Sequence, residues 1–274
     1  MKKVLTLILS VVLMLSCFAP VHASAASTPS TYSVGLNYLQ SHGINERTIA
    51  LMSEDEICEY ANAQFSQSDS SYYAYIYDKE TENITLEQYT VSEYNSIVQK
   101  MKTRASNDKE YSWMLLNITS TYLGGDNYCI MCEYEWLTNP VVRYTDIVAL
   151  TFDTRIVSQK GTGSAKMEYT NSDGLPTEVD YSSLVKYSNT GVYVDFNIPG
   201  WGNTDIFGYM STNAKVNNLS GNTVSFNNWA YYAHKTNVFS GSYSVSFPVG
   251  GGFTITPSGS FNVADVGLLT TYNP

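Results

Sequence analysis

Apolar and polar residues alternate with a period of two along most of the chain from residue 111 onward. Such alternation is typical of strands whose two faces meet different surroundings. The predicted strands cover residues 111–122, 128–137, 141–152, 166–170 and 192–198, with weaker candidates at 223–226 and 230–234. Gly, Asn, Asp and Pro stand between many of these segments, which favours antiparallel hairpins. We therefore expect a mainly β protein with an antiparallel, sandwich-like domain over residues 109–274.

The alternation is clearest near the C-terminus, where Tyr243, Val245 and Phe247 alternate with serines. After three consecutive glycines, Phe253 and Ile255 alternate with threonines. This pattern predicts a hairpin with one apolar face and one hydroxyl-rich face. The hairpin carries no charged side chain. A membrane-active, toxin-like protein that inserts this hairpin into an oligomeric barrel is therefore an alternative function.

The segment before the β domain has a different, helical pattern. Residues 33–65 predict short helices, and Ser53 with Glu56 forms a capping box, in which each side chain satisfies a backbone amide of the other. A hairpin is predicted over residues 71–89. A second capping box opens an amphipathic helix at Thr90. These elements predict a small N-terminal helical or α+β part.

The first 25 residues have the organisation of a secretory signal peptide. A basic start precedes a short apolar run, and small residues allow cleavage after Ala23 or Ala25. The bulky neighbours of Cys17 argue against a lipoprotein. No later segment reaches the roughly 18 apolar residues that a membrane helix needs. We therefore expect a signal peptide at 1–25, the N-terminal part at 26–108, and secretion into the extracellular space.

Charge and cysteine content argue against one class of partner and two kinds of site. The net charge is −10, and removal of two signal-peptide lysines makes it −12, which argues against nucleic acid as a partner. Cys58, Cys129 and Cys132 remain after the predicted cleavage. Residues three apart on a strand point to opposite faces, so the Cys129–Cys132 spacing does not indicate a redox or zinc site. We expect buried free thiols; a disulfide from Cys58 to one of the other two is the alternative.

The sequence contains no recognised catalytic, metal-binding or cofactor-binding motif, and we assign no catalytic residue, metal or cofactor. His42 fits a helix end, and His234 follows aromatic residues near a turn. Glu133 and Glu135 lie two apart on a predicted strand, so they share a face, which we expect to be solvated. Paired carboxylates are the machinery of glycoside hydrolysis. A carboxylate-dependent hydrolase is therefore the third functional interpretation.

The tryptophans divide into two groups. Trp113 and Trp136 lie within strand patterns and are expected in the core. Trp201 lies in a Pro-Gly-Trp-Gly-Asn loop, and Trp229 follows two asparagines, so we expect both at the surface as ligand contacts. An exposed indole offers a platform for a glycan or a lipid headgroup. The leading interpretation is a secreted, non-enzymatic binding or surface-interaction protein, whose partner is a glycan or another cell-surface component.

One polar segment, E-W-L-x-x-P-x-x-R-x-T-D from Glu135 to Asp146, joins two predicted strands at a proline. Asp146 is a carboxylate on an otherwise apolar face, and Arg143 points to the opposite face. We predict structural roles for Trp136, Arg143 and Asp146, with Asp146 accepting hydrogen bonds from the backbone of this corner. The segment resembles a motif in uncharacterised exported proteins of Gram-positive bacteria. The resemblance implies a secreted, β-rich protein and brings no known activity or site.

Overall fold

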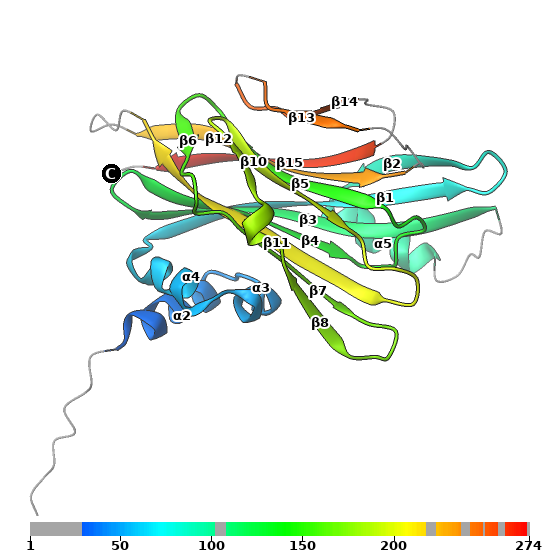
Figure 1. Ribbon diagram of the computed structural model, residues 1–274, viewed down its shortest axis with the longest axis horizontal. Helices are drawn as coiled ribbons and strands as arrows, with labels where there is room; N and C mark the ends of the chain where they lie inside the picture. Colours follow the sequence, from blue (N-terminus) through cyan, green and yellow to red (C-terminus); the bar gives the residue numbers. More distant parts are fainter. Residues whose placement is uncertain are drawn as a thin grey trace, which may run out of the picture. The chain divides into compact units, whose positions relative to one another are not determined.

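A computed structural model describes residues 29–101, 108–217, 223–236, 242–248, 250–256 and 261–272. The predicted signal peptide, residues 1–25, lies outside the described residues. From Thr31 onward these residues belong to one unit, which contains two antiparallel sheets, a separate two-stranded hairpin and several short helices (Figure 1). The prediction of a mainly β, antiparallel, sandwich-like protein with short N-terminal helices is confirmed.

The larger sheet has eight strands in the order β2-β1-β3-β4-β11-β7-β8, with β6 paired to β11. The strands are β1 Phe65–Asp78, β2 Asn83–Tyr89, β3 Lys109–Gly124, β4 Asn127–Trp136, β6 Ile156–Ser158, β7 Ser164–Thr170, β8 Pro176–Asp180 and β11 Thr204–Val216. The β1–β2 hairpin, predicted within the N-terminal part, is thus an edge of the same sheet as β3. Hydrogen bonding therefore continues from the N-terminal part into the β domain.

The smaller sheet has five strands in the order β15-β12-β5-β10-β9. The strands are β5 Thr145–Phe152, β9 Lys186–Ser188, β10 Gly191–Asn197, β12 Val224–Lys235 and β15 Phe261–Tyr272. The predicted C-terminal hairpin is present as two short strands, β13 Ser244–Ser246 and β14 Thr254–Thr256, with Val245 opposite Ile255. Its apolar side chains pack on Ile147 and Ala233 of the smaller sheet. The apolar face of the hairpin is therefore buried against the protein.

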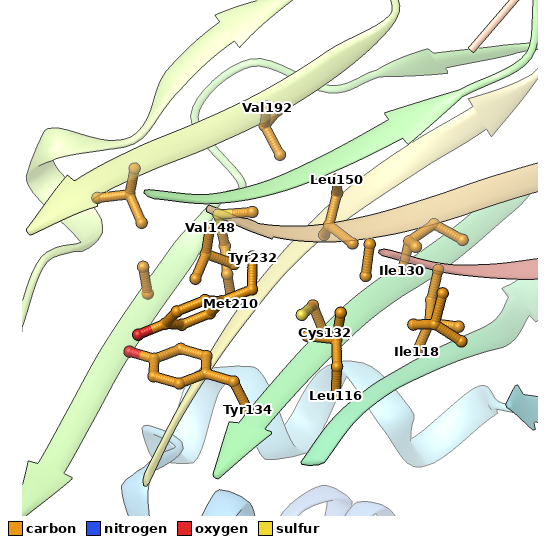
Figure 2. Close-up of a cluster of buried hydrophobic side chains, with 14 of the residues drawn as sticks. Leu116, Ile118, Ile130, Cys132, Tyr134, Val148, Leu150, Val192, Met210 and Tyr232 are labelled. Atoms are coloured by element: carbon orange, nitrogen blue, oxygen red, sulfur yellow. The ribbon is translucent and has the colours of Figure 1, made fainter. Parts of the chain in front are cut away.

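The main hydrophobic core lies between the two sheets. Leu116 and Ile130 contribute from the larger sheet, and Val148 and Leu150 contribute from the smaller one; all four are fully buried (Figure 2). Strand alternation sends every second side chain into this layer, which is why the period-two pattern located the core. Trp136 is 3 % exposed and belongs to this core.

Helices cover parts of the outer face of the larger sheet. The helices are α2 Thr31–Ser41, α3 Glu46–Leu51, α4 Glu54–Glu59, α5 Val91–Met101 and the 3₁₀ turns η2 Tyr60–Asn62 and η3 Ser182–Leu184. The capping box of Ser53 and Glu56 is confirmed at the start of α4. Met131 and Phe207, from the outer face of the sheet, pack in one buried cluster with α2–α4. Trp113 packs in a second cluster with Tyr94 of α5.

The alternation of apolar and polar residues did not predict two long strands, β11 and β15. β11 lies between β4 and β7, and most of its residues are buried on both faces, so it lacks the alternation of a half-exposed strand. β15 also went unrecognised, and β12 is one continuous strand where two weak segments were predicted. β11, β12 and β15 are therefore recognised by their hydrogen bonding to neighbouring strands, and not by alternation of apolar and polar residues within each strand.

The three cysteines of the described residues are free thiols, so the disulfide alternative is wrong. Cys132 faces the core between the sheets, and Cys129 faces the helices, which confirms that their side chains point to opposite faces. Burial raises the pKa of Cys129 to about 12 and raises that of Cys132 further. Cys58 is partly exposed.

We expect Cys58 to react with a thiol reagent well before the two buried cysteines, because the reactive species is an accessible thiolate. Timed labelling followed by mass spectrometry of the native protein checks this order. Cys58→Ser should abolish the fast phase, and denaturant should release the two slow sites. Fast labelling of Cys129 in the native protein would contradict the burial seen here.

Candidate functional site

A groove of about 300 Å³ lies on the outer face of the larger sheet. We call it the outer groove. Its lining comes from the α2–α3 connection and from four strands: Gly43, Asn45, Ser70, Tyr72, Leu115, Asn117, Glu133, Tyr134, Glu135 and Phe207. The helices α2–α4 and α5 pack on separate clusters of this face. Of the sheet residues that line the groove, Phe207 belongs to the α2–α4 cluster, and the others belong to neither cluster.

Strand register sets the floor of the outer groove. Ser70 of β1 is paired with Asn117 of β3, which in turn is paired with Glu133 of β4. In the next row, Tyr72 is paired with Leu115 and Leu115 with Glu135. Because paired residues project to the same face, polar side chains from three strands gather on one surface. The floor is therefore built on the rigid part of the fold.

Glu133 is 7 % exposed, so the expectation of a solvated face is wrong for this residue. The hydroxyl of Thr48, from α3, donates to one of its carboxylate oxygens, and the Asn117 amide nitrogen donates to the other at 2.7 Å. The helices cover a face that alternation alone assigned to solvent. Thr48 is itself fully buried. Glu133 is consequently held in one orientation by two uncharged donors.

Glu135 belongs to a charged cluster around Arg47. The guanidinium of Arg47 is 3.2 Å from Glu135 and 3.0 Å from Asp205, and it also contacts Glu168. The same guanidinium stacks over Phe207, with 4.6 Å between its central carbon and the ring centroid. Burial, and to a lesser extent the charges of Asp205 and Glu133, raises the pKa of Glu135, although Arg47 opposes this shift. One cation therefore serves three carboxylates.

Aromatic residues flank the groove. The Tyr72 ring stacks on Tyr94 of α5, with 4.2 Å between centroids. Tyr94 also packs edge-on against Trp113, which is buried beneath α5. Burial raises the pKa of Tyr94, and the charge of Glu135 contributes to that rise. The Tyr72 ring is thus fixed beside the carboxylates by α5.

Asp146, predicted as a structural residue, lies at the centre of a buried hydrogen-bond network. Its carboxylate accepts from the Tyr232 hydroxyl at 2.6 Å, from Nδ1 of His234 at 2.9 Å and from the Lys235 amide at 3.2 Å. The indole of Trp136 donates to the Tyr232 hydroxyl at 3.0 Å. Side chains from β12, rather than the corner backbone, are therefore the main partners of Asp146. This network joins the two sheets and is not open to a ligand.

Arg143 holds the loop that carries Trp201. Its guanidinium donates to the carbonyl oxygens of Pro199 and Gly200, each at 2.7 Å. The same group lies 5.4 Å from the centroid of the Trp201 ring. Burial lowers the pKa of Arg143. Trp201 is 74 % exposed, and its loop is further closed by the Asn203 amide, which donates to the Gly200 carbonyl.

Trp229, the other predicted ligand contact, lies in a different setting. It is in β12 and is partly buried. A Cβ added at Gly251 would lie 2.0 Å from its six-membered ring, and one added at Gly267 would lie 2.9 Å from its five-membered ring. Two glycines thus pack closely against the indole. Trp229 offers less open ring surface than Trp201, and its ligand contact stays a prediction.

The sequence did not indicate several residues that line the groove or contact its carboxylates. Arg47, Thr48 and Asn117 carried no motif, because an Arg in a short helix or an Asn in a strand is common at exposed positions. Tyr232 and His234 share a face with Ala230 in the period-two pattern, which was the one available signal for the Asp146 network. Within the described ranges, no three His, Cys, Asp or Glu side chains are grouped so as to hold a metal ion. Among the same residues, no helix is long and apolar enough to span a membrane.

Comparisons with known proteins give only weak similarities. No protein-family model matches the chain, and no curated protein sequence matches it. Similar solved structures include the major pilin subunit BcpA of Bacillus cereus, at 14 % identity and TM-score 0.32, over 54 % of this chain and 34 % of the pilin. The collagen-binding subdomain ACE19 of the Enterococcus faecalis surface protein ACE has 6 % identity and TM-score 0.32, over 55 % of this chain and 90 % of that one.

A third similar structure is the C-terminal domain of the Streptococcus agalactiae AgI/II polypeptide BspA. It has 8 % identity and TM-score 0.32, over 74 % of this chain and 84 % of that domain. The present chain thus spans about a third of the pilin and most of the other two. Similarity at this level does not indicate a ligand or a function for this protein.

Proposed function

We propose that this protein is a secreted, non-enzymatic binding protein that contacts a glycan through the loop carrying Trp201. The observation behind the proposal is the 74 % exposure of an indole on a loop fixed by Arg143. An exposed aromatic ring is suited to stacking on the apolar face of a sugar ring. Because hydrogen bonds already order the loop, less conformational entropy is lost on binding.

The strand ends that lead to Arg143 and to the Trp201 loop carry polar groups that suit a hydroxyl-rich ligand. Thr145 and Asn197 are hydrogen-bonded to each other at 2.8 Å on neighbouring strands, close in sequence to Arg143 and Pro199. Both side chains combine donor and acceptor atoms, which is the chemistry that sugar hydroxyls require. The proposed contact surface therefore consists of the Trp201 ring with a polar rim.

Binding is favoured over hydrolysis by the state of the two carboxylates. Glu133 accepts hydrogen bonds on both oxygens from Thr48 and Asn117, and Glu135 is paired with Arg47. A glycoside hydrolase needs one carboxyl group to deliver a proton and the other to attack or to activate water. Glu133 is instead held beneath α3. Glycan turnover that disappears in both Glu133→Gln and Glu135→Gln would reverse this choice.

We expect Trp201→Ala to weaken glycan binding by about thirtyfold or more, because truncation of a central tryptophan contact typically costs about 2 kcal/mol. Screening the secreted protein on a glycan array, followed by titration calorimetry with the best glycan, measures the effect. The thermal unfolding of the variant should match that of wild type, since the ring is mostly exposed.

Leu269→Ala is the matched control, because it also removes an exposed apolar side chain, on β15 of the smaller sheet. Its glycan affinity should equal that of wild type. Equal weakening in both variants would indicate nonspecific apolar adhesion. Undiminished binding by Trp201→Ala would remove the loop from the binding surface.

A further inference from the structure

We propose that the outer groove binds the ammonium group of an alkylamine, the group that ends a lysine side chain. The site is distinct from the Trp201 loop, since Trp201 does not line the groove. Three features of the groove carry the proposal: its size, the balance of charge around it, and the tyrosine beside its carboxylates.

The size of the groove fits a small ligand. At about 300 Å³ it lies at the lower end of the range for small-molecule pockets, roughly 300–1,000 Å³. One alkylamine or one long side chain can enter such a space, whereas an oligomer cannot be enclosed. The polar part of the floor, made by Ser70, Asn117, Glu133 and Glu135, lies beside apolar Leu115 and Phe207. An alkylamine has the same division into an apolar stem and a polar end.

The carboxylates of the groove lack sufficient positive charge. Among the residues that the structure describes, the hydrogen-bond donors to the Glu133 carboxylate are the uncharged groups of Thr48 and Asn117. Glu135 shares the single guanidinium of Arg47 with Glu168 and Asp205. Oε2 of Glu135 has no hydrogen-bond partner among the residues that the structure describes. An ammonium group would donate to this oxygen and offset the excess negative charge.

The electrostatic surroundings support the same ligand. Burial, and to a lesser extent the charges of Asp205 and Glu133, raises the pKa of Glu135 although Arg47 opposes the shift, so a further cation nearby would stabilise the ionised carboxylate. Tyr72 lines the groove, and its ring is held in place by stacking on Tyr94, so an aromatic side chain is available to a cation in the groove. The whole chain carries a net charge of −10, which attracts cations and repels anionic ligands.

The proposal is tested with two amines and an uncharged counterpart of each. The amines are n-pentylamine, which represents a free alkylamine, and Nα-acetyl-lysine-N-methylamide, which represents a peptide side chain. The uncharged partners are n-pentanol and the Nε-acetylated lysine derivative. Titration calorimetry gives affinities, and ¹H–¹⁵N correlation spectra of the full protein locate the site. We expect saturable binding of at least one amine, with shifts of the Tyr72, Asn117 and Glu135 amides, and no binding of the uncharged probes.

Glu135→Gln should weaken amine binding by at least about tenfold, because it removes a charge-assisted hydrogen bond. Glu80→Gln is the matched control: it makes the same substitution at an exposed position in the β1–β2 turn and should leave the affinity unchanged. If Glu135→Gln disturbs folding, Tyr72→Leu supplies a second test, with an expected loss of about threefold from the removed cation–π contact.

Several results would overturn the proposal. These are absence of saturable amine binding at millimolar probe concentrations, equal affinity for charged and uncharged probes, and unchanged affinity in Glu135→Gln. When the capped lysine binds at least tenfold more tightly than pentylamine, the ligand is a peptide side chain, and otherwise it is a free amine. Both of these outcomes support an ammonium site, and neither depends on glycan binding at Trp201.

Discussion

Asp146→Ala should lower the free energy of unfolding by about 3–5 kcal/mol, because it removes a fully buried carboxylate that accepts hydrogen bonds from three donors. The carboxylate is fully buried, and its removal leaves the Tyr232 hydroxyl, the His234 imidazole and the Lys235 amide without their acceptor. Each buried donor that loses its partner carries a desolvation penalty of about 1–3 kcal/mol. Urea unfolding followed by tryptophan fluorescence and far-UV circular dichroism measures the loss.

The control for this prediction is Asp69→Ala. Asp69 also lies on a strand but is exposed, and its carboxylate accepts a hydrogen bond from the amide of the neighbouring Ser70. Its effect on stability should stay within about 0.5 kcal/mol. An unchanged unfolding midpoint for Asp146→Ala, together with lost ligand binding, would assign Asp146 to function instead of to the fold.

Gly208→Ala should destabilise the protein by about 2–3 kcal/mol through overpacking at the centre of the larger sheet. Gly208 lies in β11 between Tyr134 of β4 and Met167 of β7. An added Cβ would lie 2.3 Å from the Tyr134 hydroxyl and 2.8 Å from the Lys166 carbonyl oxygen. The carbonyl belongs to a paired strand and cannot retreat without loss of register. The same unfolding titration measures the effect.

Gly200→Ala tests whether the loss depends on space rather than on glycine itself. Gly200 lies in the Trp201 loop, where an added Cβ would be 4.0 Å from the side-chain amide nitrogen of Asn203. We expect little change in stability for this variant. Equal destabilisation by both substitutions would contradict the close approach of Tyr134 as the reason for glycine at position 208.

Much of the fold was predictable because its rules are local. Period-two alternation identified β3, β4 and β5, and it assigned Trp136 and Asp146 to inward-facing positions. The capping box at Ser53 fixed the start of α4, because its hydrogen bonds join residues three apart. β11 was missed for the converse reason: burial on both faces removes the alternation by which a strand is recognised.

The candidate sites depended on contacts between distant parts of the chain. His234 reaches Asp146 across 88 positions, and Arg47 reaches Glu135 across the same separation. Local periodicity assigns a side chain to a face but does not say what covers that face. The pattern therefore predicts a solvated Glu133, whereas the packing of α3 on the sheet buries this side chain.

The sequence by itself determined the strand-rich composition, the inward-facing residues of β3, β4 and β5, the opposed directions of Cys129 and Cys132, and the loop position of Trp201. The tertiary structure alone decided that Arg143 fixes the loop of Trp201 and that Gly251 packs on Trp229. It also decided that the carboxylates of β4 line a groove beneath the helices. The physical reason is that backbone geometry repeats every two residues along a strand, whereas burial and charge balance arise only when separate segments meet.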